Sequence, residues 1–488
     1  VFMVIRKSAM QRFEQWLEQY RNFEKNPEKD FFRLDTMRYL CERFGNPQNA
    51  YKSIHVAGSK GKGSVSVFCA SVLEEAGFKT GLYLSPHVAD IRERISGPFS
   101  FLPETEYEKA VNAFIPAAEF FITEAGDKKT KPTWFELMTL FAFFCFRSCG
   151  MEWVVFETGL GGRLDATNVL LPQVCAITQI ELEHTEYLGT TLQAIAGEKA
   201  GIIKQGIPVC IAPQKNEVKN VFEHKAREMQ APILCIGDAA NINYKSGNLS
   251  GAPPGCDAGN GNFGSAAEIS FSAEKLRQFE KAYGRRLSFS RPLTARLKLQ
   301  GKFQAENAAT AAAAVKLALP AIDERIIERG LEKAFLPARF ETVKVPVQNG
   351  TLTIVIDGCH TANSMKGTLE TFYAHFGAQC HLLFACAADK DVESMARLIK
   401  DSPCSFSRIA LTVPGSAKRS DYEKTVRAFS SYSESASAAV VHADKDFGRA
   451  IRQAIDCAAK ENKTLLCAGS FYLAGEVKNA IRKLNPAM

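Results

Sequence analysis

The segment HVAGSKGKGS (residues 55–64) has the composition of a loop that binds the phosphate groups of a nucleotide. Such loops follow the pattern G-x-x-x-x-G-K-[ST], in which backbone N–H groups surround the phosphates and the lysine neutralises their charge. The segment departs from this pattern at two positions. Val56 replaces the first glycine, and Gly63 replaces the hydroxyl residue, so that the serine comes one position later, at Ser64.

The remaining residues of the segment suit phosphate chemistry. Gly58, Gly61 and Gly63 let backbone N–H groups approach an anion closely. Lys62 supplies a compact positive charge, and Ser64 can offer a hydroxyl oxygen to Mg²⁺. A glycine-rich turn with a surface lysine is the alternative interpretation.

Three later segments contain side chains that could join such a site. Glu157 ends a buried-strand pattern and precedes a glycine-rich loop, so its carboxylate could hold Mg²⁺ or simply cap the loop. Glu183 and His184 follow another strand pattern, and this histidine could equally be a surface residue. Lys199 lies in a helical segment with small neighbours, where a solvated lysine is the alternative.

The elements that must position these residues are predicted from the spacing of apolar residues. A strand pattern over 53–57 precedes the glycine loop, and one apolar helical face runs from 65 to 76 before Gly77. Further strand patterns cover 80–84, 153–156, 174–180 and 208–211, with helical patterns between them. This alternation predicts an α/β fold with a parallel sheet and crossover helices.

A second α/β series follows residue 335, where we expect a domain boundary that divides the chain into 1–335 and 336–488. Its predicted strands cover 352–356, 381–385, 408–412, 438–441 and 464–468. Helices are expected over 10–20, 34–44 and 306–317. Residues 241–266, rich in Gly, Asn, Ser and Pro, predict a long surface loop or a disordered insertion.

Composition excludes several classes of protein. The 488 residues are 46% hydrophobic and 23% charged, with a net charge of +7 that forms no dense basic block, so no nucleic-acid partner is expected. No apolar run reaches the roughly 18 residues of a membrane span. The 14 cysteines include no C-x-x-C pair, and Cys145 and Cys149 are predicted core residues rather than metal ligands. We therefore expect a cytoplasmic enzyme or binding protein.

Six segments, taken in order, resemble the folylpolyglutamate synthase/dihydrofolate synthase family of the Mur ligase superfamily. They are HVAGSKGKGS, LSPHVADIRERI, FETGLGGRLDATN, LEHTEYLGTTLQAIAGEKAGI, LPARFE and IDGCH. The resemblance spans nearly the whole chain. It implies a P-loop ATPase domain with a central, mainly parallel sheet, a smaller Rossmann-like C-terminal α/β domain, and ATP-dependent ligation of L-glutamate to dihydropteroate or a reduced folate.

The resemblance also implies which residues bind the nucleotide. The family's own loop reads GTNGKGS, so Gly63 and Ser64 match the family spacing, whereas Ser59 and Lys60 replace its Thr-Asn pair. The implied ATP-binding residues are Gly58, Ser59, Lys60, Gly61, Lys62, Gly63, Ser64, Gln304, Asn307, Arg339, Asp357 and His360. Phe303, Cys359 and Thr361 depart from the family pattern beside these residues.

Metal, catalytic and substrate roles follow from the same resemblance. It implies two Mg²⁺ sites with ligands Ser64, Glu157, His184 and Lys199, the last matching a lysine that is carbamylated in many members. Glu183 replaces the aspartate that usually precedes the histidine. The implied catalytic residues are Lys62, Lys199, His184 and Arg339, and the implied substrate contacts are Ser85, His87, Arg94, Thr133, Phe135 and Asp165.

The implied reaction has alternatives that the sequence leaves open. In the reaction, ATP phosphorylates the carboxylate and the glutamate amine then displaces phosphate, with Lys62 and the Mg²⁺ ions neutralising charge. The chain could be a bifunctional enzyme that makes dihydrofolate and extends folates, or a ligase with one of these activities. A non-catalytic P-loop protein and a Mur ligase acting on a UDP-sugar peptide are weaker alternatives. We expect a monomer that acts on small molecules.

Overall fold

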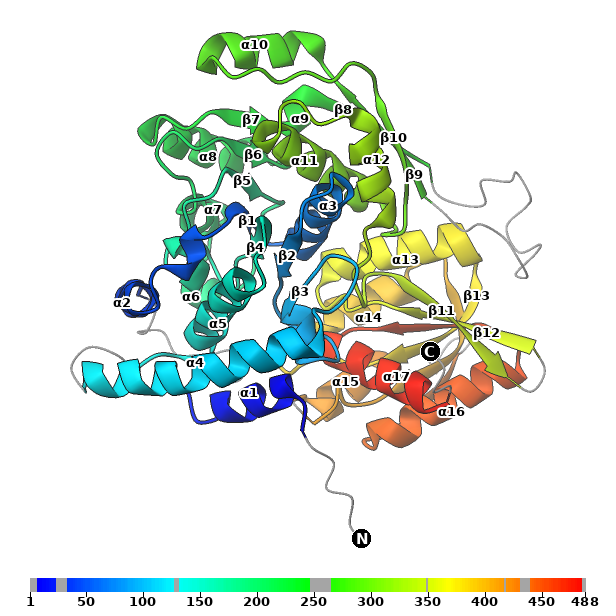
Figure 1. The fold of residues 1–488 in the computed structure, drawn as a ribbon. Coiled ribbons are helices and arrows are strands. Elements are labelled where there is room, and N and C mark those ends of the chain that lie inside the picture. The colour runs from blue at the N-terminus through cyan, green and yellow to red at the C-terminus, as the bar shows by residue number, and fades with distance from the viewer. Residues whose placement is uncertain are drawn as a thin grey trace. The chain divides into compact units, whose positions relative to one another are not determined.

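The computed structural model describes residues 7–22, 33–126, 131–245, 265–347, 350–416, 418–430 and 439–484 (Figure 1). The chain divides into two compact units. Unit 1 comprises Val1–Asn243, Ala267–Leu297 and Gln304–Phe335, and unit 2 comprises Tyr244–Ala266, Lys298–Phe303 and Leu336–Met488. Each unit contains its own α/β sheet, as the two series of strand patterns predict.

The sheet of unit 1 has seven strands in the order β3-β2-β4-β1-β5-β6-β7. Their bounds are Ile95–Ser96, Thr80–Tyr83, Trp153–Glu157, Lys52–Ala57, Val174–Ile177, Val209–Ile211 and Ile233–Cys235. Every pairing is parallel except that of β2 with β3. The five predicted strands are confirmed. The strands β3 and β7 were not predicted, because two or three residues are too few to show a period.

The helices of unit 1 surround this sheet. Helix α3 (Lys62–Glu75) is buried continuously from Gly63 to Leu73, and α12 (Glu324–Lys333) packs against it. The remaining longer helices are α1 (Ala9–Leu17), α2 (Asp35–Arg43), α4 (Glu104–Ala125), α5 (Trp134–Ser148), α7 (Leu192–Ala200), α8 (Asn216–Glu228), α10 (Ala273–Tyr283) and α11 (Lys302–Ala318). The predicted helices near the N-terminus and at 306–317 are thus confirmed with shifted ends.

An aromatic core joins α1, α4 and α5 to the sheet. The ring of Phe13 lies 4.1 Å from that of Phe141, and Phe114 packs against both rings edge-on. Cys145 and Cys149 are buried in the same cluster, so the prediction that they are core residues is confirmed. Buried aromatic area of this kind is the main source of hydrophobic stabilisation in a domain.

The sheet of unit 2 has six strands in the order β11-β12-β16-β13-β14-β15. Their bounds are Glu341–Val347, Gly350–Ile356, Thr464–Ala468, Gln379–Phe384, Ser405–Leu411 and Val440–Ala443. Its helices are α13 (Ala362–Phe376), α14 (Val392–Lys400), α15 (Tyr422–Phe429), α16 (Phe447–Lys460) and α17 (Phe471–Leu484). The five strands predicted after residue 335 are confirmed within a few residues at their ends.

Strand β11 was not predicted. It pairs with β12 in antiparallel fashion at the edge of the sheet and contains Pro346. Proline lacks a backbone N–H and is tolerated in edge strands, where one side of the strand needs no partner. The proline therefore concealed a strand that the alternating residues around it would otherwise have indicated.

The segment predicted as a long loop or insertion, 241–266, begins and ends in strands. β8 (Ala240–Lys245) and β9 (Ser265–Phe271) belong to a three-stranded sheet with β10 (Leu293–Leu297). Residues 246–264 lie outside the described residues. Within the described ranges, none of the helices is both long and apolar enough to span a bilayer.

The contact between α3 and α12 makes a prediction about stability. A Cβ on Gly330 of α12 would lie 2.5 Å from the Cα of Val72, whereas a Cβ on Gly197 of α7 would meet nothing within 4 Å. Gly330→Ala should destabilise the protein by about 1–3 kcal/mol through overpacking. The matched Gly197→Ala should stabilise it by about 0.5–1 kcal/mol, because alanine favours the helix. Urea unfolding of both variants measures this, and equal effects would contradict the close packing.

Candidate active site

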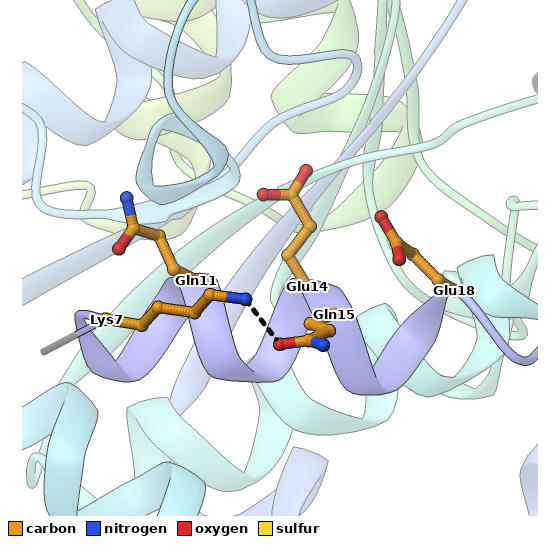
Figure 2. A pocket seen from close by; sticks show the side chains of 5 residues that line it. All are labelled: Lys7, Gln11, Glu14, Gln15 and Glu18. Carbon is orange, nitrogen blue, oxygen red and sulfur yellow. Dashed lines mark hydrogen bonds between the residues drawn. The ribbon is translucent and has the colours of Figure 1, made fainter. Parts of the chain in front are cut away.

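Two hollows on unit 1 contain none of the predicted site residues. One, of about 370 Å³, lies along α1, with the polar side chains of Lys7, Gln11, Glu14, Gln15 and Glu18 around it (Figure 2). The other, of about 250 Å³, lies where β6 and β7 end and includes Pro213, Lys219 and Asp238. The predicted chemistry must therefore be sought from the residues themselves, at the carboxyl ends of β1, β4 and β5.

The glycine loop connects β1 to α3, as predicted. Gly58 has φ 147° and Gly61 has φ 89°, values that L-residues with side chains rarely adopt. A Cβ on Gly58 would overlap Oγ1 of Thr178, and one on Gly61 would overlap Oδ1 of Asn307. The loop is therefore confined between the end of β5 and helix α11, and only glycine fits at both positions.

Hydrogen bonds fix the shape of the loop. The backbone N–H groups of Ser59 and Lys60 both donate to the carbonyl of Gln179, at 3.0 and 3.1 Å. Nζ of Lys62 donates to the carbonyl of Gly58 at 3.0 Å. Ser64 is buried in the first turn of α3. Lys62 and Ser64 thus both lie in the first turn of α3, where their side chains could bind a phosphate group and a cation.

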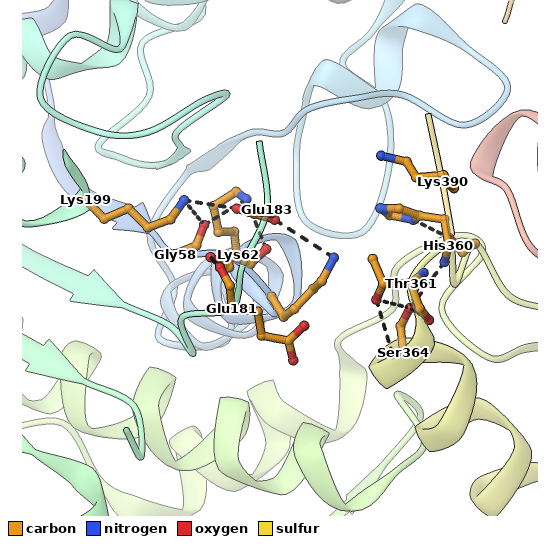
Figure 3. A network of polar contacts seen from close by, with 12 residues as sticks. Gly58, Lys62, Glu181, Glu183, Lys199, His360, Thr361, Ser364 and Lys390 are labelled. Carbon is orange, nitrogen blue, oxygen red and sulfur yellow. Dashed lines mark hydrogen bonds and ion pairs between the residues drawn. The ribbon is translucent and has the colours of Figure 1, made fainter. Parts of the chain in front are cut away.

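Lys199 is buried beside this loop and is not a solvated residue. Its side chain is 1% exposed, and Nζ donates to the carbonyl of Gly58 at 2.7 Å and lies 3.1 Å from Oε1 of Glu183 (Figure 3). Burial lowers the pKa of Lys199 to about 8, against the opposing effect of the Glu183 carboxylate. Lys199 is therefore closer to neutrality than an exposed lysine.

Glu183 is the acidic centre of this group. Burial by itself would raise its pKa, but Lys62, Lys199 and Lys60 outweigh that effect and lower the pKa to about 2. Lys60 Nζ lies 3.9 Å from Oε2 of Glu183. The glutamate that replaces the family's aspartate is thus anionic at any ordinary pH and holds a cluster of lysines around Gly58.

The predicted metal ligands occupy two different environments. Glu157, the last residue of β4, pairs in register with Val56 of β1 and is 5% exposed. Its Oε2 accepts the backbone N–H of Ser85 at 3.0 Å. His184 is exposed and has φ 47° at the start of α6 (Thr185–Leu188). A buried carboxylate and a buried hydroxyl, Ser64, suit a hard cation such as Mg²⁺.

Within the described residues, no cluster of three or more His, Cys, Asp or Glu side chains is arranged to hold a metal. The set expected from the sequence contains only two residues of these types, together with a serine and a lysine. The donors that are present at the loop therefore fit Mg²⁺ only with oxygen atoms from elsewhere, such as those of nucleotide phosphates.

Asp165, predicted to contact the substrate, organises the loop after β4. Its Oδ2 accepts the backbone N–H groups of Gly159 and Leu160 at 2.9 and 3.0 Å, and its Oδ1 accepts both the N–H and the hydroxyl of Thr167. Nε2 of the fully buried His55 lies 2.8 Å from Oγ1 of the same threonine. The Asp165 carboxylate thus makes hydrogen bonds within the protein and holds the loop after β4.

Two further predicted substrate contacts flank this loop. Thr133 caps α5, where its hydroxyl accepts the N–H of Glu136 at 3.1 Å and the Glu136 carboxylate accepts the Thr133 N–H. The ring of Phe135 packs so closely over Gly159 that a side chain on this glycine would overlap it. Phe135 therefore packs against the glycine-rich loop, whereas Thr133 fixes the start of the helix that carries Phe135.

His87 and Arg94 form a contact of their own. Nε of Arg94 donates to Nδ1 of His87 at 2.9 Å, and the Arg94 guanidinium lies 4.8 Å from the ring centroid of Trp134. Arg94 is 1% exposed. The ring of Trp134 compensates in part for burial of the Arg94 cation. The hydrogen bond from Arg94 in turn holds the imidazole of His87.

The Gln304–Asn307 pair on α11 lies at the glycine loop. Nδ2 of Asn307 donates to Oε1 of Gln304 at 3.0 Å, and both side chains are buried. Asn307 is the residue that excludes a side chain at Gly61. The structure thus brings these two residues next to the predicted nucleotide loop, although about 240 residues separate them in sequence.

The other predicted nucleotide residues belong to unit 2. The buried Asp357 directly follows β12, and its carboxylate accepts the N–H groups of Phe340 at 2.7 Å and Cys359 at 2.8 Å. Burial raises the pKa of Asp357, whereas Arg339 opposes that shift. Nδ1 of His360 lies 2.8 Å from the carbonyl of Gly358. Asp357 therefore holds the segment that carries Arg339.

Two family descriptions match the chain. Residues 56–315 match the Mur ligase middle domain, and residues 338–471 match the Mur ligase glutamate ligase domain. The dihydrofolate synthase/folylpolyglutamate synthase of Bacillus subtilis (strain 168) is 30% identical over 483 residues, which cover 97% of this chain and 100% of that protein. The chain belongs to the Mur ligase family of folylpolyglutamate and dihydrofolate synthases. It is an ATP-dependent ligase.

Other members of this family agree with that assignment. The folylpolyglutamate synthase of Lacticaseibacillus casei is 30% identical over 389 residues, covering 78% of this chain and 81% of that protein. The fold is shared with the Mycobacterium tuberculosis folylpolyglutamate synthase complexed with ADP, with a TM-score of 0.78 over 97% of this chain and 98% of that one, at 24% identity. The resemblance inferred from the motifs is confirmed.

The sequence predicts no binding or catalytic role for two residues that contact the candidate site residues, Glu183 and Phe471. Glu183 was noted only as a departure from the family, although its place between a strand and His184 was a usable signal. Phe471, whose ring lies 4.0 Å from the Arg339 guanidinium, gave no signal, because a phenylalanine at the start of a helix is usually a packing residue.

The charge cluster predicts how stability depends on pH. The pKa of Glu183 falls from 4.5 to about 2 on folding, so its contribution to stability is complete above pH 4.5 and is lost as the pH falls toward 2. Glu183→Gln should be less stable than the wild type at pH 7, and the difference should narrow between pH 4.5 and 2.5. Urea midpoints at several pH values measure it.

Glu181→Gln is the matched control. Among the described residues no lysine pairs with the Glu181 carboxylate, so this variant should unfold like the wild type at each pH. A constant gap between Glu183→Gln and the wild type from pH 7 to 2.5 would contradict the ion-pair cluster.

Proposed function

We propose that the enzyme joins the amine of L-glutamate to the carboxylate of dihydropteroate and of reduced folates, at the expense of ATP. The observation that carries this proposal is the glycine loop with its buried Lys199–Glu183 pair at Gly58. The Bacillus subtilis relative, whose name includes both activities, aligns over its whole length and supports the bifunctional form. A single activity is the alternative outcome.

The nucleotide would bind where the loop offers its backbone. The turn leads directly into the start of the 14-residue helix α3, a position that favours anions, whereas the N–H groups of Ser59 and Lys60 already donate to the Gln179 carbonyl. The Mycobacterium tuberculosis folylpolyglutamate synthase, which has the same fold, is complexed with ADP, and this supports nucleotide binding by this chain. Lys62 would turn from the Gly58 carbonyl to the phosphates, and Arg339 of unit 2 would contact the phosphates as well.

The magnesium ions would be held by Ser64 and Glu157, with His184 and Lys199 as further candidates. When bound, the ions would neutralise phosphate charge during transfer to the substrate carboxylate. The protein's own part is to hold the reacting groups: Lys62 stabilises the transferred phosphoryl group, and the fixed loop excludes misplaced nucleotides. The carboxylate then becomes an acyl phosphate, from which the glutamate amine displaces phosphate.

The substrate-side residues would be those that line the loop after β4. Ser85, His87 and Arg94 lie in one segment whose Ser85 N–H binds Glu157, so this segment would connect the cation site to the pterin side. Thr133 at the start of α5 and Phe135 beside Gly159 would contact the substrate, and Asp165 would act by fixing the loop.

Lys199 would be carbamylated in the active enzyme. A neutral amine adds CO₂ to give a carbamate and a proton, and the pKa of about 8 for Lys199 gives it a larger fraction of neutral amine than an exposed lysine has. A carbamate next to the Glu183 carboxylate would place two anions at Gly58, an arrangement that a divalent cation would stabilise. ¹³C-labelled bicarbonate would reveal the carbamate by NMR in the wild type and not in Lys199→Met.

The two proposed domains are consecutive in the sequence. We propose 1–335 as the ATP-binding domain and 336–488 as the glutamate ligase domain, consistent with the two family matches. The enzyme would act on small molecules as a monomer.

The direct test measures phosphate release from Mg-ATP and L-glutamate with dihydropteroate, tetrahydrofolate or a UDP-muramoyl peptide as acceptor. Release with both pterins supports the bifunctional enzyme, and release with one supports a single activity. Release with neither pterin would overturn the proposal.

Lys62→Ala should lower kcat by about 10²–10³-fold, because a charge aimed at the transferred phosphoryl group is lost. Lys109→Ala, which removes an exposed lysine of α4, is the matched control and should leave kcat unchanged. Unchanged turnover in Lys62→Ala would show that the loop does not act on the phosphates.

A further inference from the structure

The side chain of Phe471, the first residue of α17, contacts two of the predicted nucleotide residues of unit 2. The Arg339 guanidinium lies 4.0 Å from the centroid of its ring. The imidazole of His360 meets the same ring edge-on, with centroids 5.4 Å apart and planes at 62°. The ring of Phe471 therefore contacts both Arg339, which precedes β11, and His360, which follows β12.

The backbone on both sides of Arg339 is held in an unusual conformation. Ala338 has φ 55° and Phe340 has φ 51°, values in the left-handed region that non-glycine residues seldom occupy. Two hydrogen bonds hold this conformation, from Phe340 N–H to the Asp357 carboxylate and from Gly358 N–H to the Ala338 carbonyl at 2.9 Å. The direction in which the Arg339 side chain leaves the backbone is therefore fixed.

The ring has its place because Gly358 lacks a side chain. A Cβ on Gly358 would overlap the ring of Phe471. The turn before α17 is fixed as well, since Tyr472 N–H donates to Oγ of Ser470 at 3.1 Å. The backbone conformation thus places the Arg339 side chain over the Phe471 ring, and Gly358 and the turn before α17 fix the position of that ring.

We propose that Phe471 is a positioning residue for the ligation reaction: its ring face holds the Arg339 guanidinium in the orientation that binds the nucleotide phosphates. The proposal rests on the proposed function for the phosphate-binding role of Arg339. Stacking engages the face of a guanidinium, whereas its N–H donors point outward in the plane, so one group can stack and bind phosphate together. An arginine ordered before binding loses less side-chain freedom when phosphate arrives.

The test measures the Kd of ADP and of a non-hydrolysable ATP analogue by calorimetry, with full-length protein. Phe471→Leu keeps the apolar bulk but removes the ring face, and it should weaken nucleotide binding about ten-fold, as expected for loss of a partly buried cation–π contact. Phe471→Tyr keeps the face and should bind nearly as the wild type does. Phe447→Leu, which changes the first residue of α16, is the matched control and should have no effect.

A double-mutant cycle separates positioning from general packing. Arg339→Ala should weaken binding by itself, and Phe471→Leu should add little in the Arg339→Ala background, because the ring then has no guanidinium to hold. Equal effects of Phe471→Leu in both backgrounds, or wild-type binding by Phe471→Leu, would overturn the proposal. Melting temperatures of all variants show whether each one is folded.

The readout also distinguishes this inference from the proposed function. If the wild type binds nucleotide but releases no phosphate with either pterin, the substrate assignment fails while the cycle still decides the role of Phe471. If Arg339→Ala binds nucleotide like the wild type, the arginine has no phosphate role, and the positioning role of Phe471 falls with it.

Discussion

The site in unit 1 depends on the close approach of the Gly58–Gly61 turn to two other segments. The hydroxyl of Thr178 touches the backbone of Gly58 from the end of β5, and Asn307 touches that of Gly61 from α11. Because neither position can accept a Cβ, the turn is fixed by contact rather than by its own hydrogen bonds alone. The Gly58 carbonyl accepts hydrogen bonds from Nζ of Lys62 and of Lys199. The positions of these two cationic side chains therefore depend on the contacts that fix the turn.

This arrangement explains why an unusual set of charges can be buried together. Lys199 is almost fully buried, and an unpaired buried ammonium would be strongly unfavourable. The Glu183 carboxylate and the Gly58 carbonyl supply partners, and the surrounding lysines keep that carboxylate ionised. These charged groups therefore depend on one another, and loss of the Glu183 carboxylate would leave several positive charges around one turn.

The two units use their backbones differently. In unit 1, glycines allow contact between segments, and Lys62 and Ser64 lie in the first turn of α3. In unit 2, Ala338 and Phe340 adopt left-handed conformations around Arg339 without being glycines, and the buried Asp357 holds them. Such conformations persist only where the surrounding structure enforces them. The local strain at Arg339 therefore agrees with a functional role for that residue.

The sequence predicts most of the elements, the strand–loop–helix of the phosphate loop and the family, because apolar periodicity and the spacing of Gly63 and Ser64 are local properties. It could not show β11, whose Pro346 hides the strand pattern, or the short strands β3 and β7. Nor could it show that Asp165 is used within its own loop or that Phe471 stacks on Arg339. These features depend on contacts that form only in the folded chain. Residues such as Gly61 and Asn307 lie far apart in sequence, and their contact exists only once the sheet has brought their segments together.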